Sequence, residues 1–514
     1  MRLIIHIIAL VTALGGLVFG FDSGIIATTF GHESFRLTMY GPSQANPSLT
    51  GAIVSLYNVG QSLGGLSVGY LADRFSRKYT ISLAALISII GAALQTGATH
   101  VGMMIAGRLV AGVACGQMLA VVPIYIAEVA PAENRGFLVG LQGMMVAIGF
   151  GLANWVGYAG SFAAGSATWR VPLAMQIPIP LILMVAVLFV PFSPRWLIKQ
   201  DRIEEAKQVL FRLHGGSMTG NELVAQELVQ IQEQLKREQE ESGTGWGVAL
   251  AAMFSRRYVR RTATAAFIVV QAQLSGAPVI QNYQNIFYAQ VGFTGKTSLL
   301  ISGVYGMMGI IGTGIYLAIV ADKWPRARTL WSGSLLLAVN ISLCMALSAK
   351  FGSASAEANM DGARASIAFI FIYSALFAMF FNAMIWVVPS ELFPMFLRSK
   401  GLAFAVFMKS VVAIVLSQIT PVALANISWR LVTPNYYPSL TLPSVTKDNR
   451  YYALFIATNT TAGILYYFFL PETGGKTLEE IAELFGDTLA TDRLGEIDLD
   501  AKNAALVDEV EDRR

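Results

Sequence analysis

The stretch LAFAVFMKSVVAIVLSQITP, residues 402–421, carries a single charge, Lys409, within a largely apolar run. Twenty residues in a helix extend about 30 Å, the thickness of the hydrocarbon core of a bilayer, so the stretch predicts a transmembrane helix. Lys409 lies roughly 15 Å along that helix from the basic flank at Arg398 and Lys400, near the bilayer midplane. A charge at that depth costs about 2.5 to 3.5 kcal/mol and usually faces a partner or a water-filled cavity.

Similar apolar runs dominate the rest of the chain. Of its 514 residues, 54% are hydrophobic and only 13% are charged, and most of the charge lies between the apolar blocks. This distribution is typical of a multi-pass protein embedded in a lipid bilayer. The net charge of +4 gives no support for nucleic-acid binding, because the basic residues belong to loops beside the membrane. Cys115 and Cys344 both lie in apolar segments, so we expect no structural disulfide.

Twelve candidate spans of roughly 18 to 25 residues are arranged as six before and six after one long polar interruption. The interruption contains RIEEAKQVLFRLHG (202–215) and a Glu/Gln/Lys-rich segment near 222–241, both of which predict surface helices. The spans lie at residues 3–26, 50–71, 79–97, 101–121, 137–158, 172–191, 264–290, 298–321, 329–349, 366–389, 400–424 and 451–470.

The chain therefore divides into two bundles. An N-terminal six-helix bundle occupies 1–192 and a C-terminal six-helix bundle occupies 263–470, with a loop of amphipathic helices at 193–262 and a tail at 471–514. Lysine and arginine gather in alternate connections, so the positive-inside rule places both termini and the middle loop in the cytoplasm. The basic residues of these connections include Arg74, Arg77, Lys78, Arg135, Lys323, Arg326, Arg328, Arg398 and Lys400.

Two pairs of turns recur half a chain apart. The turn GYLADRFSRK (69–78) is echoed by LAIVADKWPRAR (317–328), and IAEVAPAENRG (126–136) is echoed by SELFPMFLRSKG (390–401). Such repeats are typical of carriers built from two related halves.

At three of these turns and at five further motifs the chain resembles the sugar porter family of the major facilitator superfamily, in the style of its fungal branch. The resemblance implies an all-α membrane protein with the major facilitator fold, in which 12 transmembrane helices form two pseudo-symmetric six-helix bundles. It also implies a multi-pass protein of the plasma membrane that moves a small-molecule sugar by alternating access. The matching motifs are GGLVFGFDSG (15–24), GYLADRFSRK (69–78), GRLVAG (107–112), PIYIAEVAPAENRG (123–136), SPRWL (193–197), QLSG (273–276), WVVPSELFPMFLRSKG (386–401) and PETGGKTLEEI (471–481).

An acid and a base in the first half are candidates for proton coupling. Asp22 lies in a span otherwise free of charge, and Arg108 lies near the start of the fourth span. Buried opposite charges are tolerable as a pair and expensive alone, so we expect them to pair. Protonation of the carboxylate would release the pair and free the helices to rearrange. Proton symporters of the family carry Asp and Arg at the matching positions; a static structural pair is the alternative.

The charged turns predict a gate at the cytoplasmic ends of the helices. Ion pairs there can latch the two halves together when the carrier faces outward, whereas solvated pairs that only set topology are the alternative. The chain departs from the family pattern at Phe192, in place of a glutamate, and at Ser76, in place of a glycine. The gate candidates are Asp73, Arg74, Arg77, Glu128, Arg135, Glu391 and Arg398.

The resemblance also indicates where substrate binds, and there the chain departs most from the family. Neutral sugars are held by amides that serve as donors and acceptors, with an aromatic face under the ring. The offsets of Gln271, Ser275, Asn282 and Asn285 place them roughly on one face of a continuous helix. Hydrogen bonding between helices is the alternative role for such polar residues. The candidate substrate contacts are Gln142, Gln271, Gln273, Asn282, Tyr283, Asn382, Trp386 and Lys409.

Lys409 replaces an amide that contacts the sugar in relatives. An ammonium at that position can bind a carboxylate, which suggests an acidic sugar such as a uronate or a quinate. Alternatively, Lys409 pairs with Asp22 or with an acid on another helix and serves coupling, or it is a neutral buried amine.

One insertion does not fit the family. LVTPNYYPSLTLPSVTKDNR (431–450) stands between the last two spans, where it forms a long external loop or represents translated intron sequence.

The sequence thus predicts a secondary active transporter for a sugar or polyol, with protons as the coupled ion. A facilitative uniporter and a non-transporting sugar sensor are the alternatives. An enzyme is not expected, because the four histidines are scattered and neither a metal-ligand cluster nor a nucleotide-binding or nucleophile motif occurs, and no cofactor is implied.

Overall fold

The structure is a computed structural model that describes residues 2–43, 46–131, 134–214, 228–229, 231–232, 246–290, 293–321, 323–351, 360–428, 450–474, 476, 481 and 485. These residues form helices joined by short turns, and none of them lies in a β-strand. The predicted segment near 222–241 and the insertion 431–450 fall almost wholly outside the described residues.

The first half of the chain holds six spans, the last of which is broken. Its helices are α1 (Arg2–Thr29), α2 (Glu33–Tyr40), η1 (Gly41–Ser43), α3 (Pro47–Phe75), α4 (Arg77–Thr96), α5 (Val101–Val129), α6 (Arg135–Gly160), α7 (Ala167–Ala174), α8 (Pro178–Ala186) and η3 (Val187–Phe189).

Short helices follow in the connection, namely α9 (Pro194–Lys199), α10 (Ile203–His214) and α12 (Trp246–Met253). In α10 the apolar Ala206, Leu210 and Leu213 are buried while Glu204 and Glu205 are exposed, as the amphipathic pattern predicts.

The second half repeats the arrangement. Its helices are α13 (Val259–Leu274), α14 (Ala277–Gln290), α15 (Gly295–Ile315), η4 (Tyr316–Val320), α16 (Arg326–Phe351), α18 (Met360–Phe380), α19 (Met384–Leu392), α20 (Met395–Ser428) and α21 (Arg450–Phe469).

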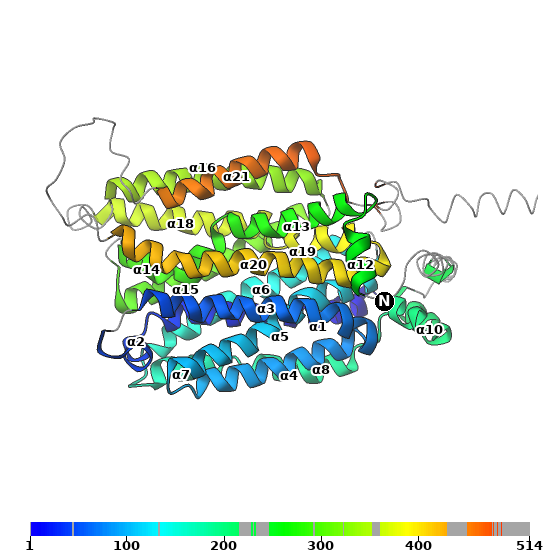
Figure 1. The fold of residues 1–514 in the computed structure, drawn as a ribbon, viewed down its shortest axis with the longest axis horizontal. Helices are drawn as coiled ribbons and strands as arrows, with labels where there is room; N and C mark the ends of the chain where they lie inside the picture. The colour runs from blue at the N-terminus through cyan, green and yellow to red at the C-terminus, as the bar shows by residue number, and fades with distance from the viewer. Residues whose placement is uncertain are drawn as a thin grey trace, which may run out of the picture.

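The helices run side by side along the long axis, with the N terminus at one end and α2 and α14 at the other (Figure 1). Ten described stretches are long and apolar enough to cross a membrane. The other two predicted spans correspond to α3, which buries many polar residues, and to α21, whose apolar part Ala453–Phe469 is short. The all-α membrane fold is therefore confirmed.

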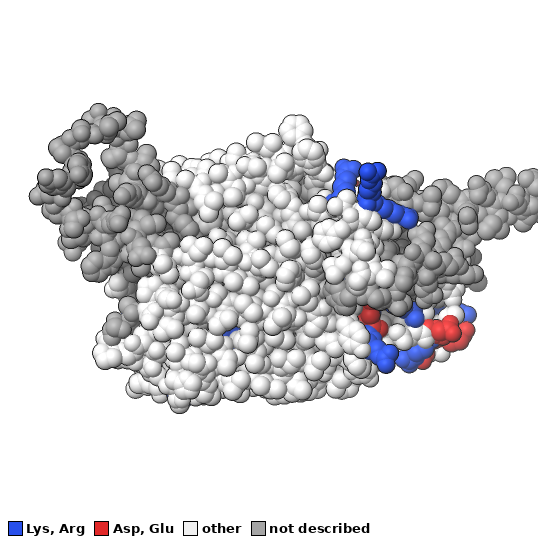
Figure 2. All heavy atoms as spheres, in the orientation of Figure 1, with Lys and Arg blue, Asp and Glu red and all other residues white. Residues whose placement is uncertain are grey.

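Charge is concentrated at one end of the molecule on the face that Figure 2 shows. Lys, Arg, Asp and Glu gather at the end where the chain begins, and the described surface along the bundle is almost free of them (Figure 2). Large apolar side chains such as Leu63, Leu86 and Val339 are exposed along the bundle instead. A side surface of this kind suits a bilayer, in which apolar side chains face lipid.

The halves meet along two long helix pairs, because α3 packs against α20 and α6 packs against α15. Within the first half, α3 and α5 approach so closely that a Cβ at Gly64 would lie 2.0 Å from the carbonyl oxygen of Val113. Only glycine permits that contact.

The seventh span is broken rather than continuous. Gly276 separates α13 from α14 with φ +95°, and a Cβ there would lie 2.8 Å from the ring of Phe455. A second irregularity follows at Tyr283, whose φ is −121°. The prediction that residues before and after Gly276 share one helical face was therefore wrong, because the break changes the direction of the side chains.

Ser76 adopts a backbone conformation that suits glycine. Its φ of 87° and ψ of 157° place it in a region that L-residues rarely occupy, while its side chain caps α4 by accepting from the Tyr79 N–H at 3.4 Å. Such backbone strain costs about 1 to 3 kcal/mol of stability. Replacing a serine cap by glycine costs only about a few tenths of a kcal/mol.

We therefore expect Ser76→Gly to stabilise the protein by about 1 kcal/mol, measured as a higher midpoint of thermal unfolding in detergent. Ser76→Ala is the matched control, because it removes the cap and keeps the strain. A glycine variant less stable than the alanine variant would contradict the assignment of strain to this residue.

Candidate functional site

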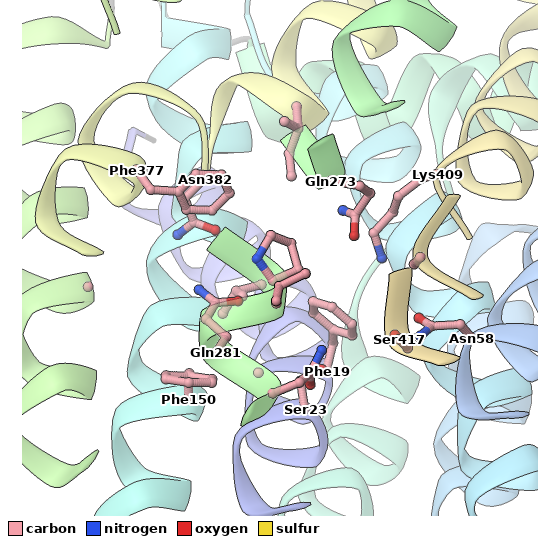
Figure 3. Close-up of a pocket in the computed structure, with 18 of the residues that line it drawn as sticks. Phe19, Ser23, Asn58, Phe150, Gln273, Gln281, Phe377, Asn382, Lys409 and Ser417 are labelled. Carbon is pink, nitrogen blue, oxygen red and sulfur yellow. Dashed lines mark hydrogen bonds between the residues drawn. The ribbon is translucent and has the colours of Figure 1, made fainter. Parts of the chain in front are cut away.

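A cavity of about 110 Å³ is lined by residues of both halves, and Figure 3 shows it in close-up. Side chains from α1, α3 and α6 line it on one side, and side chains from α13, α14 and α20 line it on the other. Six of the eight predicted substrate contacts are among these lining residues, namely Gln273, Asn282, Tyr283, Asn382, Trp386 and Lys409.

Three amide side chains in the cavity are available to a ligand. The structure gives Gln273, Gln281 and Asn282 no hydrogen-bond partner among the described residues, although all three line the cavity. Trp386 of α19 adds an aromatic side chain that is only 3% exposed. Amides that combine donors with acceptors, beside an aromatic side chain, suit a molecule that carries several hydroxyl groups.

Lys409 carries the only charge among the described residues that line the cavity. Its Nζ donates to Oε1 of Gln61 at 2.9 Å, and it lies 5.1 Å from the centre of the Phe19 ring. Among the described residues the ammonium has no carboxylate partner, which disfavours the alternative of a pair with Asp22. Figure 3 shows that Lys409 and Gln273 both point into the cavity. A ligand therefore meets a buried cation held by neutral groups.

Two of the lining residues already have structural bonds. The amide of Asn382 donates to the carbonyl oxygen of Gly143 at 2.8 Å and to Oγ1 of Thr313 at 3.1 Å. The hydroxyl of Tyr283 donates to the carbonyl oxygen of Ser417 at 2.7 Å. These hydrogen bonds indicate that the two side chains stabilise the wall of the cavity at least as much as they provide hydrogen-bonding groups for a ligand.

The other two predicted contacts lie outside the cavity lining. Gln271 donates to Oδ1 of Asn459 at 3.4 Å, so its amide faces α21 rather than the cavity. Gln142 is fully buried, and neither polar atom of its side chain has a hydrogen-bond partner in the described part of the chain. Contact with substrate would require both side chains to turn.

Gln61 and Gln281 were missed by the sequence reasoning. Gln61 lies on α3, a helix that contains many glycine, serine, asparagine and glutamine residues. The sequence of α3 therefore does not show which of them faces the cavity. Gln281 lies beyond the break at Gly276, where the direction of side chains cannot be extrapolated from α13.

Asp22 and Arg108 form a pair behind the cavity wall. Nη1 of Arg108 lies 3.9 Å from Oδ1 of Asp22 and donates to the main-chain oxygen of the same residue at 2.9 Å. The guanidinium also lies 3.9 Å from the ring centre of Tyr57, which lines the cavity. The thiol of Cys115 donates to Oδ2 of Asp22 at 3.4 Å. Both charges are buried, so the carboxylate is connected to the cavity through Tyr57 rather than exposed to it.

We call the end that carries Arg77, Glu128, Arg326 and Glu391 the charged end. In the first half, Arg77 pairs with Glu128 at 2.9 Å and donates to the carbonyl oxygen of Ala72. In the second half, Arg326 lies 3.7 Å from Glu391 and donates to the carbonyl oxygen of Ala321. The two halves thus repeat the same bonds, as the recurring turns predict.

Hydroxyl groups complete each cluster. Ser193 donates to Glu128 at 2.5 Å, and Thr473 donates to Glu391 at 2.9 Å. Each of these two ion pairs joins helices of one half, and the predicted latch between the halves stays a prediction. Arg74 is exposed, while Arg135 and Arg398 are buried.

A cross-half contact at the charged end involves a residue that the gate prediction omitted. Lys400 of α20 is close enough to act electrostatically on Asp73 of α3, which also pairs with Lys199 at 3.0 Å. In addition, α19 packs against α5 and α6 of the other half. The halves are therefore in contact at this end.

Hydrogen bonds also join the halves at the opposite end. The amide of Asn285 donates to the carbonyl oxygen of Ala27 at 2.6 Å, and the amide of Gln284 donates to Oδ1 of Asn154 at 2.7 Å. We call these two bonds the α14 clasp. Contacts therefore join the two halves at both ends of the cavity.

Loss of the α14 clasp is expected to open the cavity more often. Asn285→Ala removes one bond between halves, worth about 1 kcal/mol, so the open population rises roughly fivefold. A cysteine introduced at the cavity residue Ser23 should then react about fivefold faster with a thiol reagent in detergent.

Ser298→Ala is the matched control for the clasp, because Ser298 bonds the same Asn285 side chain at 2.6 Å from within the second half. Equal reaction rates in the two variants would show that the clasp does not close the cavity.

Comparisons with known proteins identify the family. The family described as Sugar (and other) transporter matches residues 8–485. This chain belongs to the sugar transporter family of the major facilitator superfamily. Among its relatives, the MFS-type transporter criB of Aspergillus cristatus is 32% identical over 482 residues, which cover 93% of this chain and 92% of that protein. The high-affinity glucose transporter of Kluyveromyces lactis is 28% identical, with 94% of this chain and 86% of that protein covered.

Solved structures of the proton:xylose symporter XylE share the fold of this sugar transporter. The structure bound to 6-bromo-6-deoxy-D-glucose is 26% identical, with a TM-score of 0.78 and coverage of 94% of this chain and 99% of that one. The inward open structure of XylE from E. coli is 25% identical and has a TM-score of 0.65. The conformation of this chain is thus more similar to the ligand-bound structure than to the inward open one.

Proposed function

We propose that this sugar transporter is a proton-coupled carrier for a carboxylated sugar or polyol, such as a uronate or a quinate. The observation that carries the proposal is Lys409, a buried cation in the central cavity whose hydrogen bond goes to the neutral Gln61. A carboxylate is the group that such a buried ammonium binds best.

The amides of Gln273, Gln281 and Asn282 supply the remaining recognition. They are placed to bind hydroxyl groups while Lys409 holds the carboxylate, so a ligand that carries both is favoured over a neutral hexose. The cavity volume of about 110 Å³ favours one small molecule over an oligosaccharide.

Asp22 is the proposed proton carrier. Its pair with Arg108 lies one layer behind the cavity, and its neighbours Phe19 and Ser23 on α1 line the cavity itself. Protonation would weaken the pair and allow α1 to move, which links the proton to the substrate. We further propose that the charged end faces the cytoplasm of a cell whose plasma membrane holds the carrier, since basic residues favour that side.

Uptake by the purified protein in liposomes tests the function directly. Radiolabelled glucuronate, quinate, glucose and xylose are compared under an imposed proton gradient, with and without an uncoupler. We expect accumulation of an acid that collapses when the uncoupler is added. Downhill movement that ignores the uncoupler would support a uniporter, faster uptake of glucose than of every acid would overturn the acidic substrate, and no uptake of any compound would favour a sensor.

A further inference from the structure

A second hollow of about 560 Å³ lies at the end opposite the charged end, and we call it the outer groove. The first half contributes α2 and the segment from Ser161 to Thr168, and the second half contributes α14 and the start of α15. Its lining shares no residue with that of the central cavity.

Helix α14 separates the two hollows. Gln281 and Asn282 face the central cavity, whereas Asn285 and Ile286, one turn further along, line the outer groove. Asn285 is also part of the α14 clasp through its bond to Ala27. A molecule in the outer groove therefore lies directly outside the helix that separates the groove from the central cavity.

Two cations line the outer groove without acidic partners. Among the described residues, neither Arg36 of α2 nor Lys296 of α15 forms an ion pair, and Nε of Arg36 is buried without a hydrogen-bond partner. Lys296 Nζ lies 4.7 Å from the centre of the exposed Phe162 ring.

The remaining titratable groups leave the groove with a net positive charge. Burial lowers the pKa of His32 to about 4, so this imidazole is neutral at pH 7. Glu33 is exposed and contributes one negative charge against the two positive ones. The hydroxyls of Ser34 and Thr168 bond each other at 2.5 Å and present polar groups nearby.

We propose that the outer groove is a recruitment site that binds the carboxylated substrate through Arg36 and Lys296 before α14 opens. A guanidinium and an ammonium in one hollow attract a carboxylate and raise its local concentration. This inference rests on the proposed function, because a neutral sugar would gain nothing from the two charges.

The proposed site in the outer groove can be tested by labelling an introduced cysteine, without a transport measurement. Cys115 and Cys344 are buried, so a cysteine introduced at the exposed lining residue Thr294 provides the reactive thiol. In detergent at low ionic strength, the rate of its reaction with an anionic, sulfonate-bearing methanethiosulfonate is divided by the rate with a cationic, trimethylammonium-bearing one. We expect Arg36→Gln and Lys296→Gln each to lower this ratio about threefold, and Glu33→Gln to raise it by a similar factor.

Matched controls and a protection assay complete the test. Lys323→Gln at the charged end should leave the ratio unchanged, and glucuronate, but not glucose, should slow the anionic reagent. The recruitment site would be overturned if the labelling ratio were unchanged in the Arg36 and Lys296 variants, or if glucose protected as well as glucuronate. In either case glucuronate uptake would still support the proposed function. Protection by glucuronate without any uptake of it would overturn the proposed function and, with it, the recruiting role.

Discussion

Replacing Lys409 with asparagine is expected to lower the uptake of an acidic sugar by about 30-fold or more and to spare or increase the uptake of a neutral hexose. Loss of one partner of a buried, hydrogen-bonded charge pair costs about 2 to 5 kcal/mol, and most of that cost comes from the carboxylate left unpaired. A neutral hexose has a hydroxyl group where the acid has its carboxylate. It loses much less binding free energy, because the asparagine amide can form a hydrogen bond with that hydroxyl group.

The measurement is the ratio of kcat/KM for glucuronate to that for glucose in liposomes. Ser410→Ala is the matched control, because Ser410 is the next residue on α20 and its hydroxyl bonds the carbonyl oxygen of Val406 within the helix at 2.8 Å. Lys409→Arg keeps the charge and should retain acid uptake in part. An unchanged ratio in the asparagine variant would remove the carboxylate from the proposal.

The depth of Lys409 in the bilayer was predictable from the sequence, and its hydrogen-bond partner was not. Span positions follow from the length and polarity of apolar runs, so the fold and the midplane position of this lysine could be predicted. Gln61 lies 348 residues away along the chain and on the other half, so only the packing of α3 against α20 brings it to the ammonium.

The same contrast holds for the other residues of the site. Asp22 and Arg108 could be paired in advance, since two buried opposite charges in one half have few other partners. Gln271 could not be excluded as a substrate contact, because the prediction assumed a helix that continues through Gly276. At the charged end the sequence predicted Arg77, Glu128 and Glu391 as gate residues but omitted Arg326, which repeats the part of Arg77 in the duplicated turn.

Neutralising Asp22 is expected to abolish accumulation while exchange across the membrane continues. With one coupled proton and a gradient of one pH unit, the carrier can accumulate substrate about tenfold, whereas Asp22→Asn should approach equal concentrations on both sides. The variant should fold, because Arg108 keeps its bond to the main-chain oxygen of residue 22 at 2.9 Å and its contact with the Tyr57 ring.

Counterflow separates this outcome from simple inactivation, because exchange of labelled for unlabelled substrate requires alternation but no proton gradient. We expect Asp22→Asn to retain counterflow and to lose the response to the uncoupler. Asp201→Asn, the same change at an exposed turn outside the spans, should behave as the unmodified protein. If Asp22→Asn still accumulated substrate tenfold, the carboxylate would not carry the proton, and the pair with Arg108 would be structural. If it lost accumulation but kept counterflow, the proton would act by releasing α1. It would not act by contacting the substrate, because Asp22 lies one layer behind the cavity.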